Sequence, residues 1–182
     1  MIWIEMPLPS HASRECDRWI ETKIMKKMRR QDKEMETAKA VQLLSAGEYG
    51  ILSTTAADGQ PYGVPLNYVY HDDAIYFHCA LNGHKIENIK NNPRVSFAVV
   101  GHSKVIPARF TTEYESVLVF GVASEIQGPE RYDALLWLVE KYSPAFIAEG
   151  KAYIEKHDKV TQVIKIDIER ISGKLSPATS KG

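Results

Sequence analysis

The chain has 182 residues, of which 44% are hydrophobic and 25% are charged, a length and composition that fit one globular domain. Lysine plus arginine and aspartate plus glutamate number 23 each, so the net charge is zero and no long-range field favours nucleic acid. No apolar run approaches the roughly 18 to 20 residues that span a bilayer, and we predict no role in a membrane.

The cysteines and the N-terminal segment bear on where the protein works. Cys16 and Cys79 are far apart and form no Cys-x-x-Cys pair, which predicts neither a disulfide framework nor a zinc site. Charged residues interrupt positions 1–24, unlike an export signal. We therefore expect a cytoplasmic protein with a loosely ordered N-terminal extension at 1–27, one domain at 28–175 and a C-terminal tail at 176–182.

The hydrophobic pattern predicts helices and strands along the rest of the chain. A first helix is expected at 37–46, with Thr37 as its N-cap and Gly47 at its end. Strands are then expected at 49–54, 62–70, 74–79, 94–100, 116–126 and 160–168. Three later helices are expected at 85–90, from Pro129 to Pro144, and at 145–156.

The order of these elements indicates the fold class. Short spacings between successive strands favour antiparallel pairing. No βαβ unit is repeated, so we predict a mainly β, α+β fold: a small antiparallel barrel flanked by helices. The polar stretch 101–115 is predicted to be a long connecting loop.

Pro65 interrupts the second predicted strand. Proline removes a backbone donor from the sheet, so this strand is expected at an edge, at a bulge, or beside a ligand that uses the free backbone groups. From the residues alone, an ordinary edge strand remains the alternative.

The stretch from Tyr76 to Phe97 combines a strand, a glycine turn, a basic helix start, a proline stop and a second strand. Gly83 permits a tight turn, and the free N–H groups near His84 and Lys85 would face an anion at the positive end of the helix dipole. A solvated helix start with two basic residues by chance is the alternative interpretation.

Several motifs occur together in an order that resembles a known family. They are Pro-Tyr-Gly-Val-Pro-Leu-Asn-Tyr-Val-Tyr (61–70), Ile-Tyr-Phe-His-Cys-Ala (75–80), Gly-His-Lys (83–85), Asn-Pro-Arg-Val-Ser-Phe (92–97) and Phe-Thr-Thr-Glu-Tyr-Glu-Ser-Val-Leu-Val-Phe-Gly (110–121). Over about 28–174 the chain resembles the flavin-binding, pyridoxamine-phosphate-oxidase-like split-barrel superfamily, and within it the branch associated with 5-nitroimidazole resistance. The resemblance implies an antiparallel, Greek-key-like split β-barrel, and a homodimer with flavin mononucleotide (FMN) at the subunit interface.

The resemblance also implies which residues contact FMN. The glycine turn and helix start would hold its phosphate, and the strand with Pro65 would present backbone groups to the isoalloxazine ring. The implied contacts are Val64, Pro65, Leu66, Asn67, His78, Cys79, Ala80, His84, Lys85 and Asn88. Cys79 itself is expected to be a small buried side chain that points away from His78.

His78 is the implied catalytic residue, in preference to His71, His102 and His157. In the resistance-associated branch the matching position lies beside the flavin, and a near-neutral pKa would suit proton delivery. Considered alone, a histidine in a strand is more often a hydrogen-bonded structural residue than a catalytic one. A metal site is not expected, because no paired carboxylates or thiolates accompany His71, His78 and His84.

Four more residues are implied contacts to substrate or to the flavin of the partner subunit: Phe110, Tyr114, Ser116 and Lys174. The alternatives are a surface loop closed by aromatic packing, and a solvated lysine near the end of the chain.

The implied function is an FMN-dependent oxidoreductase, a nitroreductase acting on 5-nitroimidazole-like planar acceptors. A reduced nicotinamide donor would bind transiently, because the chain has no Gly-x-Gly-x-x-Gly fingerprint. The alternatives are a pyridoxamine or pyridoxine phosphate oxidase-like enzyme, and a non-catalytic flavin or haem-binding protein with His78 or His84 on the iron.

Overall fold

A computed structural model describes residues 27–177 of the chain. The chain divides into two compact units, 1–31 and 32–182, and the sheet and helices discussed below belong to the second. The predictions for residues 1–26 and 178–182 fall outside the described residues. No helix in the described range is both long and apolar enough to cross a membrane.

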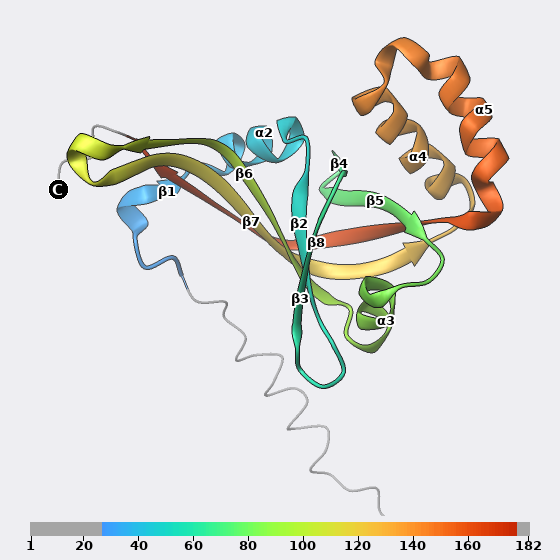
Figure 1. Ribbon diagram of the computed structural model, residues 1–182, viewed down its shortest axis with the longest axis horizontal. Coiled ribbons are helices and arrows are strands. Elements are labelled where there is room, and N and C mark those ends of the chain that lie inside the picture. Colours follow the sequence, from blue (N-terminus) through green and yellow to red (C-terminus); the bar gives the residue numbers. More distant parts are fainter. Residues whose placement is uncertain (1–26, 178–182) are drawn as a thin grey trace, which may run out of the picture. The chain divides into compact units, whose positions relative to one another are not determined.

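Eight strands form the framework of the described residues (Figure 1): β1 (Glu34–Met35), β2 (Gly50–Thr55), β3 (Pro61–Leu66), β4 (Val69–His71), β5 (Ala74–Ala80), β6 (Arg94–Ile106), β7 (Thr111–Ile126) and β8 (Thr161–Ser176). The α-helices are α2 (Thr37–Ala46), α3 (His84–Asn91), α4 (Gly128–Tyr142) and α5 (Ile147–His157). Short 3₁₀ turns are η1 (Gln31–Lys33), η2 (Pro107–Arg109), η3 (Pro144–Phe146) and η4 (Asp158–Val160).

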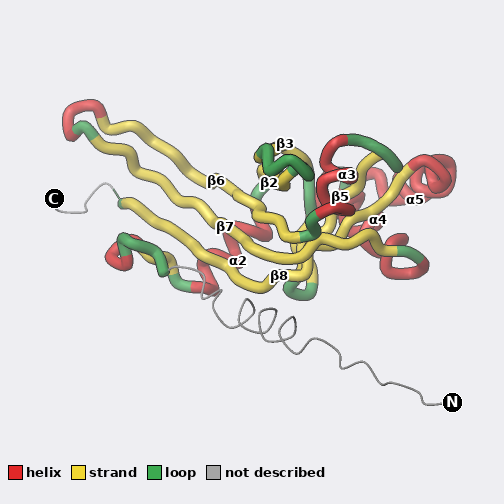
Figure 2. The backbone as a smooth tube through the Cα atoms, turned by 90° about the horizontal axis from the view of Figure 1, so that it is seen from below, coloured by secondary structure: helices red, strands yellow, loops and turns green. Residues whose placement is uncertain are grey.

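The strands form one antiparallel sheet in the order β3-β2-β6-β7-β8-β5-β4, with β1 added alongside β8. Figure 2 shows the long strands β6, β7 and β8 running side by side. The predicted mainly β architecture with flanking helices and antiparallel pairing is therefore confirmed.

The predicted loop at 101–115 is wrong, because this segment is a β-hairpin. β6 continues to Ile106, β7 begins at Thr111, and the two strands pair from Ile106 with Thr111 back through Ser103 with Tyr114. Its side chains are largely exposed, so the apolar alternation that marks a half-buried strand is absent from the sequence. Phe110 closes the turn with a positive φ of 51°.

Smaller differences concern where elements begin and end. The strand predicted at 62–70 is divided into β3 and β4, and Pro65 does lie in an edge strand. Thr37 is the first residue of α2 and Glu36 is its N-cap, so the predicted cap is wrong by one position. β8 continues to Ser176, well beyond the predicted end at 168.

The main core fills the space enclosed by the sheet. Leu44 of α2 and Ile86 and Ile89 of α3 pack there against inward residues of the strands. Tyr68, between β3 and β4, is completely buried, stacks edge-on against Phe97 at 4.8 Å, and donates its phenol hydrogen to the carbonyl of Leu44. This buried tyrosine therefore joins α2 to the sheet.

A second core lies on the other face of β5. Ile75 and Phe77 of β5 belong to the main core, while Ala74 and Tyr76 pack against Ala134, Leu135 and Leu138 of α4. Both faces of β5 are therefore covered, by the sheet interior and by α4. Since side chains alternate along a strand, His78 lies on the α4 side, one step beyond Tyr76.

Gly121 provides a test of the β7–β8 pairing. The register shifts between Phe120 and Gly121, and a Cβ at Gly121 would lie 2.3 Å from the carbonyl oxygen of Asp167. We expect Gly121→Ala to lower the free energy of unfolding by about 1 to 3 kcal/mol, because backbone must move to relieve the clash. Gly63→Ala is the control, since its Cβ would meet only Ile51 at 3.7 Å. Equal urea midpoints for the two variants would contradict this account.

Candidate functional site

The sheet is incomplete between β3 and β5. Among residues 27–177, β3 pairs with β2 alone and has no strand on its other edge, and β4 pairs with β5 only over Ala74–Tyr76. The end of β5, from His78 to Ala80, therefore has one edge without a strand partner within the described residues. This opening is the split of the barrel, and it exposes backbone donors and acceptors on two sides.

A groove of about 430 Å³ occupies the split. We call it the split groove, and it is lined by Val64, Pro65, Leu66, His78, Cys79, Ala80, Lys85, Tyr153, His157, Val160 and Thr161. The structure thus brings together seven of the ten residues predicted to contact a cofactor. They come from the start of α3 and from two strands, β3 and β5, that are separated by β2, β6, β7 and β8 in the order of the sheet.

A second cavity of about 300 Å³ adjoins the first, beneath α4 and α5. We call it the helix pocket, and it is lined by Asn67, His78, Leu135, Leu138, Val139, Tyr142, Ser143, Tyr153, Ile154, His157 and Thr161. Four of its residues also line the split groove: His78, Tyr153, His157 and Thr161. Asn67, the eighth predicted contact, lies here.

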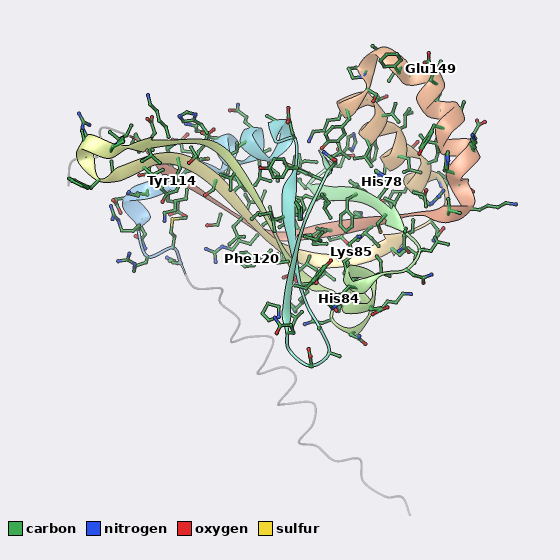
Figure 3. All side chains as sticks on the ribbon, in the orientation of Figure 1. His78, His84, Lys85, Tyr114, Phe120 and Glu149 are labelled. Carbon is green, nitrogen blue, oxygen red and sulfur yellow. The ribbon has the colours of Figure 1, made fainter. Side chains whose placement is uncertain are left out.

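The start of α3 has the backbone geometry that the sequence predicted. Gly83 has a φ of 140°, which favours glycine, and its carbonyl accepts hydrogen bonds from Ile86 (2.8 Å) and Glu87 (3.1 Å). The N–H groups of His84 and Lys85 precede the first helical hydrogen bonds. His84 and Lys85 lie together at the start of α3 (Figure 3). Lys85 lines the split groove, whereas the His84 ring packs against Tyr62, with 4.3 Å between the ring centroids.

Asn88 does not line either cavity. It is 2% exposed, and its Nδ2 donates to Oγ1 of Thr54 at 2.9 Å, which ties α3 to β2. The structure therefore gives Asn88 a contact inside the protein, where it holds the helix that carries Lys85.

His78 borders both cavities, and burial by the surrounding protein lowers its pKa below the usual 6.5. The imidazole is accessible from the cavities, yet protein atoms replace enough water to disfavour its charged form. His78 is therefore mostly neutral at pH 7, with one ring nitrogen that donates and one that accepts.

Cys79 lies on the opposite side of β5 from His78, as predicted, and belongs to the main core. Burial raises the pKa of its thiol, and Nε2 of Gln162 lies 3.7 Å from its Sγ. A raised pKa disfavours the thiolate, so this cysteine is a poor nucleophile.

Sequence reasoning missed the contribution of α5. Tyr153 and His157 lie one turn apart on this helix and line both cavities, with their rings stacked at 4.0 Å. Nδ1 of His157 donates to the carbonyl of Tyr153 at 3.0 Å, since a carbonyl oxygen can only accept. The spacing of an aromatic residue and a histidine on one helix face was visible, but nothing in the sequence places α5 over the groove.

The four predicted partner or substrate contacts line neither cavity. Phe110 is 99% exposed in the β6–β7 turn, and Ser116 pairs with Lys174 across β7 and β8. Lys174 places its Nζ 5.5 Å from the ring of Tyr114. Figure 3 shows Tyr114 toward the other end of the long strands from His78.

A polar network fixes the end of α4 beside the helix pocket. Nζ of Lys141 donates to the carbonyls of Gly47 (2.8 Å) and Tyr68 (3.0 Å). The Tyr142 hydroxyl accepts from the N–H of Tyr68 (3.0 Å) and lies within donating distance of the carbonyls of Glu48 (2.6 Å) and Tyr68 (2.7 Å). Burial lowers the pKa of Lys141 to about 8, so the ammonium form still predominates at neutral pH.

No cluster of three or more potential metal ligands, counting His, Cys, Asp and Glu, is found among residues 27–177.

A family model described as pyridoxamine 5′-phosphate oxidase matches residues 36–175, and the chain belongs to this family. A search of curated proteins found no match.

Solved structures share the fold. A candidate 5-nitroimidazole antibiotic resistance protein from Bacteroides thetaiotaomicron is 20% identical, with a TM-score of 0.63 over 78% of this chain and 85% of that one. An FAD-binding protein from Mesorhizobium loti is 28% identical, with a TM-score of 0.56 over 79% and 96%. An FAD- and haem-binding protein from Mycobacterium smegmatis is 19% identical, with a TM-score of 0.70 over 79% and 73%.

Lys141 generates a pH-dependent test of the network around the helix pocket. Its pKa is lower in the folded protein than in the unfolded chain, so the unfolded chain binds more protons between pH 8 and 10.5. We expect wild type to gain about 1 kcal/mol of stability over Lys141→Met between pH 7.5 and 9.5, after discounting for partial exposure. Urea unfolding at the two pH values measures this gain.

Lys39→Met, on an exposed face of α2, is the control, and its free energy of unfolding should change with pH as that of wild type does. The expectation would be contradicted if wild type and Lys141→Met differed in free energy of unfolding by the same amount at both pH values.

Proposed function

We propose that this protein is a flavin-dependent oxidoreductase that holds FMN in the split groove. The observation that carries the proposal is the split itself: two unpaired strand edges beside a basic helix start, in one groove. Membership of the pyridoxamine 5′-phosphate oxidase family and similarity to an FAD-binding protein support it.

The chemistry of the groove fits such a cofactor. The carbonyl and imide edges of an isoalloxazine ring need backbone donors and acceptors beside an apolar wall, and Val64, Pro65 and Leu66 supply both. Lys85 and the free N–H groups at the start of α3 suit a phosphate. FMN has one phosphate, and Lys85 is the one lysine or arginine among the described residues that line the groove. The number of phosphates therefore matches the number of permanently basic side chains.

A bound flavin supplies two-electron transfer, accepting a hydride from a reduced nicotinamide and passing electrons to an acceptor. We assign to His78 the hydrogen bond that orients the acceptor, and the delivery of a proton to it. Because its pKa is lowered, the cationic form that delivers a proton most readily grows as pH falls below 6.5. A nicotinamide donor implies a cytoplasmic setting.

We propose 5-nitroimidazole-like compounds as the acceptors. The similarity to the Bacteroides protein supports this class. Reduction of a nitro group to a nitroso group takes two electrons and two protons and releases water, so a hydride donor and a proton donor together meet its needs.

We further propose a homodimer that completes the groove. Outward residues Ile51, Ala98 and Leu118 lie side by side across β2, β6 and β7, and Ile51 and Leu118 are exposed. An exposed apolar row of this kind suits a protein interface. A second copy bound there could bring Phe110, Tyr114, Ser116 and Lys174 to the groove of its partner.

Haem is the second candidate ligand. His78 and His157 both border the junction of the two cavities, and either imidazole could bind iron. The similarity to a protein that binds FAD and haem favours keeping this alternative.

The absorption spectrum of the purified protein, before and after addition of FMN or haem, separates these candidates. Flavin bands that bleach with a reduced nicotinamide and recover under anaerobic conditions with 2-methyl-5-nitroimidazole would support the proposal. A protein that takes up haem and refuses FMN would overturn it.

Lys85→Ala should weaken FMN binding by about 10- to 100-fold, because it removes one charge-assisted contact to the phosphate. Fluorescence titration with FMN measures the dissociation constant. Lys90→Ala, an exposed lysine on the same helix that lines neither cavity, should leave it unchanged. Equal affinities for both variants would remove Lys85 from the site.

His78→Ala should keep FMN but lower the rate of nitroimidazole reduction by about 10² to 10⁴, the usual contribution of a positioned acid or base. His78→Gln separates two roles, since its amide can donate a hydrogen bond but cannot titrate. If His78 delivers a proton, the Gln variant stays slow and loses the rise in rate toward low pH. Wild-type rates in both variants would exclude His78 from the reaction.

A further inference from the structure

We propose that the helix pocket is the acceptor site and that it selects an uncharged, largely apolar ring compound, to the exclusion of phosphorylated ones. This inference deepens the proposed function and relies on it for the reaction, although the pocket itself is built from residues of one chain. Figure 3 shows His78 near α4 and α5, the helices that cover the pocket.

The lining of the helix pocket is apolar and carries no fixed charge. Its walls are the aliphatic side chains Leu135, Leu138, Val139 and Ile154, together with two tyrosines. None of the described residues that line it is Asp, Glu, Lys or Arg. An uncharged apolar ring gains by leaving water for such a site, whereas a charged group would lose its hydration without a partner.

The hydroxyl of Tyr142 does not make the pocket polar. It is already bonded to the backbone of Tyr68 and Glu48, so this residue offers the pocket its ring. Aromatic rings of a ligand stack favourably on such a surface. The network around Lys141 therefore contributes to the apolar character of the pocket as well as to its position.

Polar groups gather where the pocket meets the split groove. His157 donates from Nδ1 to the carbonyl of Tyr153, which leaves its Nε2 to contact a ligand. His78 borders the same junction. Asn67 lines the helix pocket but not the split groove, and it keeps its Oδ1 as an acceptor while Nδ2 donates to the carbonyl of Glu48 at 2.9 Å. One polar substituent of a ligand can thus be held at the junction, with the apolar body inside the pocket.

The size and position of the pocket restrict its ligand further. A cavity of about 300 Å³ is at the lower end of small-molecule sites and suits a single substituted ring. The four residues that it shares with the split groove would bring such a ring next to a cofactor in that groove.

A phosphorylated substrate would find no suitable partner for its phosphate in the helix pocket. Pyridoxamine 5′-phosphate carries a doubly charged phosphate, which needs basic side chains or free N–H groups when it leaves water. Among the described residues that line the two cavities, Lys85 is the only lysine or arginine, and it lines the split groove. With FMN on Lys85, these lining residues offer no further lysine or arginine to a second phosphate.

Equilibrium binding tests this selectivity without relying on turnover. The flavin-loaded protein is titrated by calorimetry with 2-methyl-5-nitroimidazole and, separately, with pyridoxamine 5′-phosphate. We expect the neutral compound to bind at least 10-fold more tightly. If the protein takes up no FMN, the same titrations on the protein as purified still test the pocket, so failure of the cofactor proposal and failure of this one are distinguishable.

Two variants test whether the neutral compound binds in the helix pocket. Val139→Phe fills space in the helix pocket alone and should abolish binding of the neutral compound, with FMN affinity unchanged. Tyr153→Ala removes a ring that is 65% exposed, so this variant should fold even if the first does not, and we expect affinity to fall about 5- to 10-fold. Phe146→Ala, which removes an exposed aromatic side chain that lines neither cavity, is the control.

Several outcomes would overturn the inference. They are no measurable binding of the neutral compound to wild type, tighter binding of pyridoxamine 5′-phosphate, and wild-type affinity for the neutral compound in folded Val139→Phe and Tyr153→Ala. Loss of binding in these two variants, with retention in Phe146→Ala, would support it.

Discussion

Backbone groups that lack strand partners determine where this protein can bind a ligand. Within the described residues β3 pairs with β2 alone, and β5 continues beyond its pairing with β4, so the backbone on these two facing edges has no strand partner. Backbone donors and acceptors held in a groove are costly unless something bonds to them. The Pro65 ring reduces that cost on β3, because proline has no N–H to leave unpaired. The groove is therefore shaped by the pairing pattern before any side chain is considered.

The resemblance to a family named seven residues that the structure brings into the split groove, and all seven lie in three short stretches of sequence: 64–66, 78–80 and Lys85. The residues alone gave a local signal for each stretch: a proline in a strand, alternation, and a glycine before a helix. The sequence could not show that α5 brings Tyr153 and His157 over them, because that packing depends on long-range contacts within the second core. Asn88 failed to appear at the groove because helical spacing turns it inward, onto Thr54. The hairpin at 101–115 was missed because exposed strands carry no apolar alternation.

The two cavities differ in the polarity and charge of the residues that line them. The split groove offers a lysine, a helix start and bare backbone, which suit a charged and polar molecule. The helix pocket offers aliphatic walls and two tyrosine rings, which suit an uncharged one. His78 and His157 stand where the two meet, so the same imidazoles can serve both occupants. The protein that surrounds His78 at this position lowers its pKa by replacing water around the ring.

The separation of the two hydrophobic cores has a dynamic consequence. β5 is shared between them, but α4 and α5 contribute only to the second core. Their polar contacts with the rest of the chain are made by a few side chains of α4: Glu130, Arg131, Lys141 and Tyr142. Such an arrangement allows the helical pair to open as a local cooperative unit while the barrel stays folded. Amide hydrogens of α4 and α5 should then exchange with solvent ahead of those of β6 and β7, and the same opening would widen the passage between the split groove and the helix pocket.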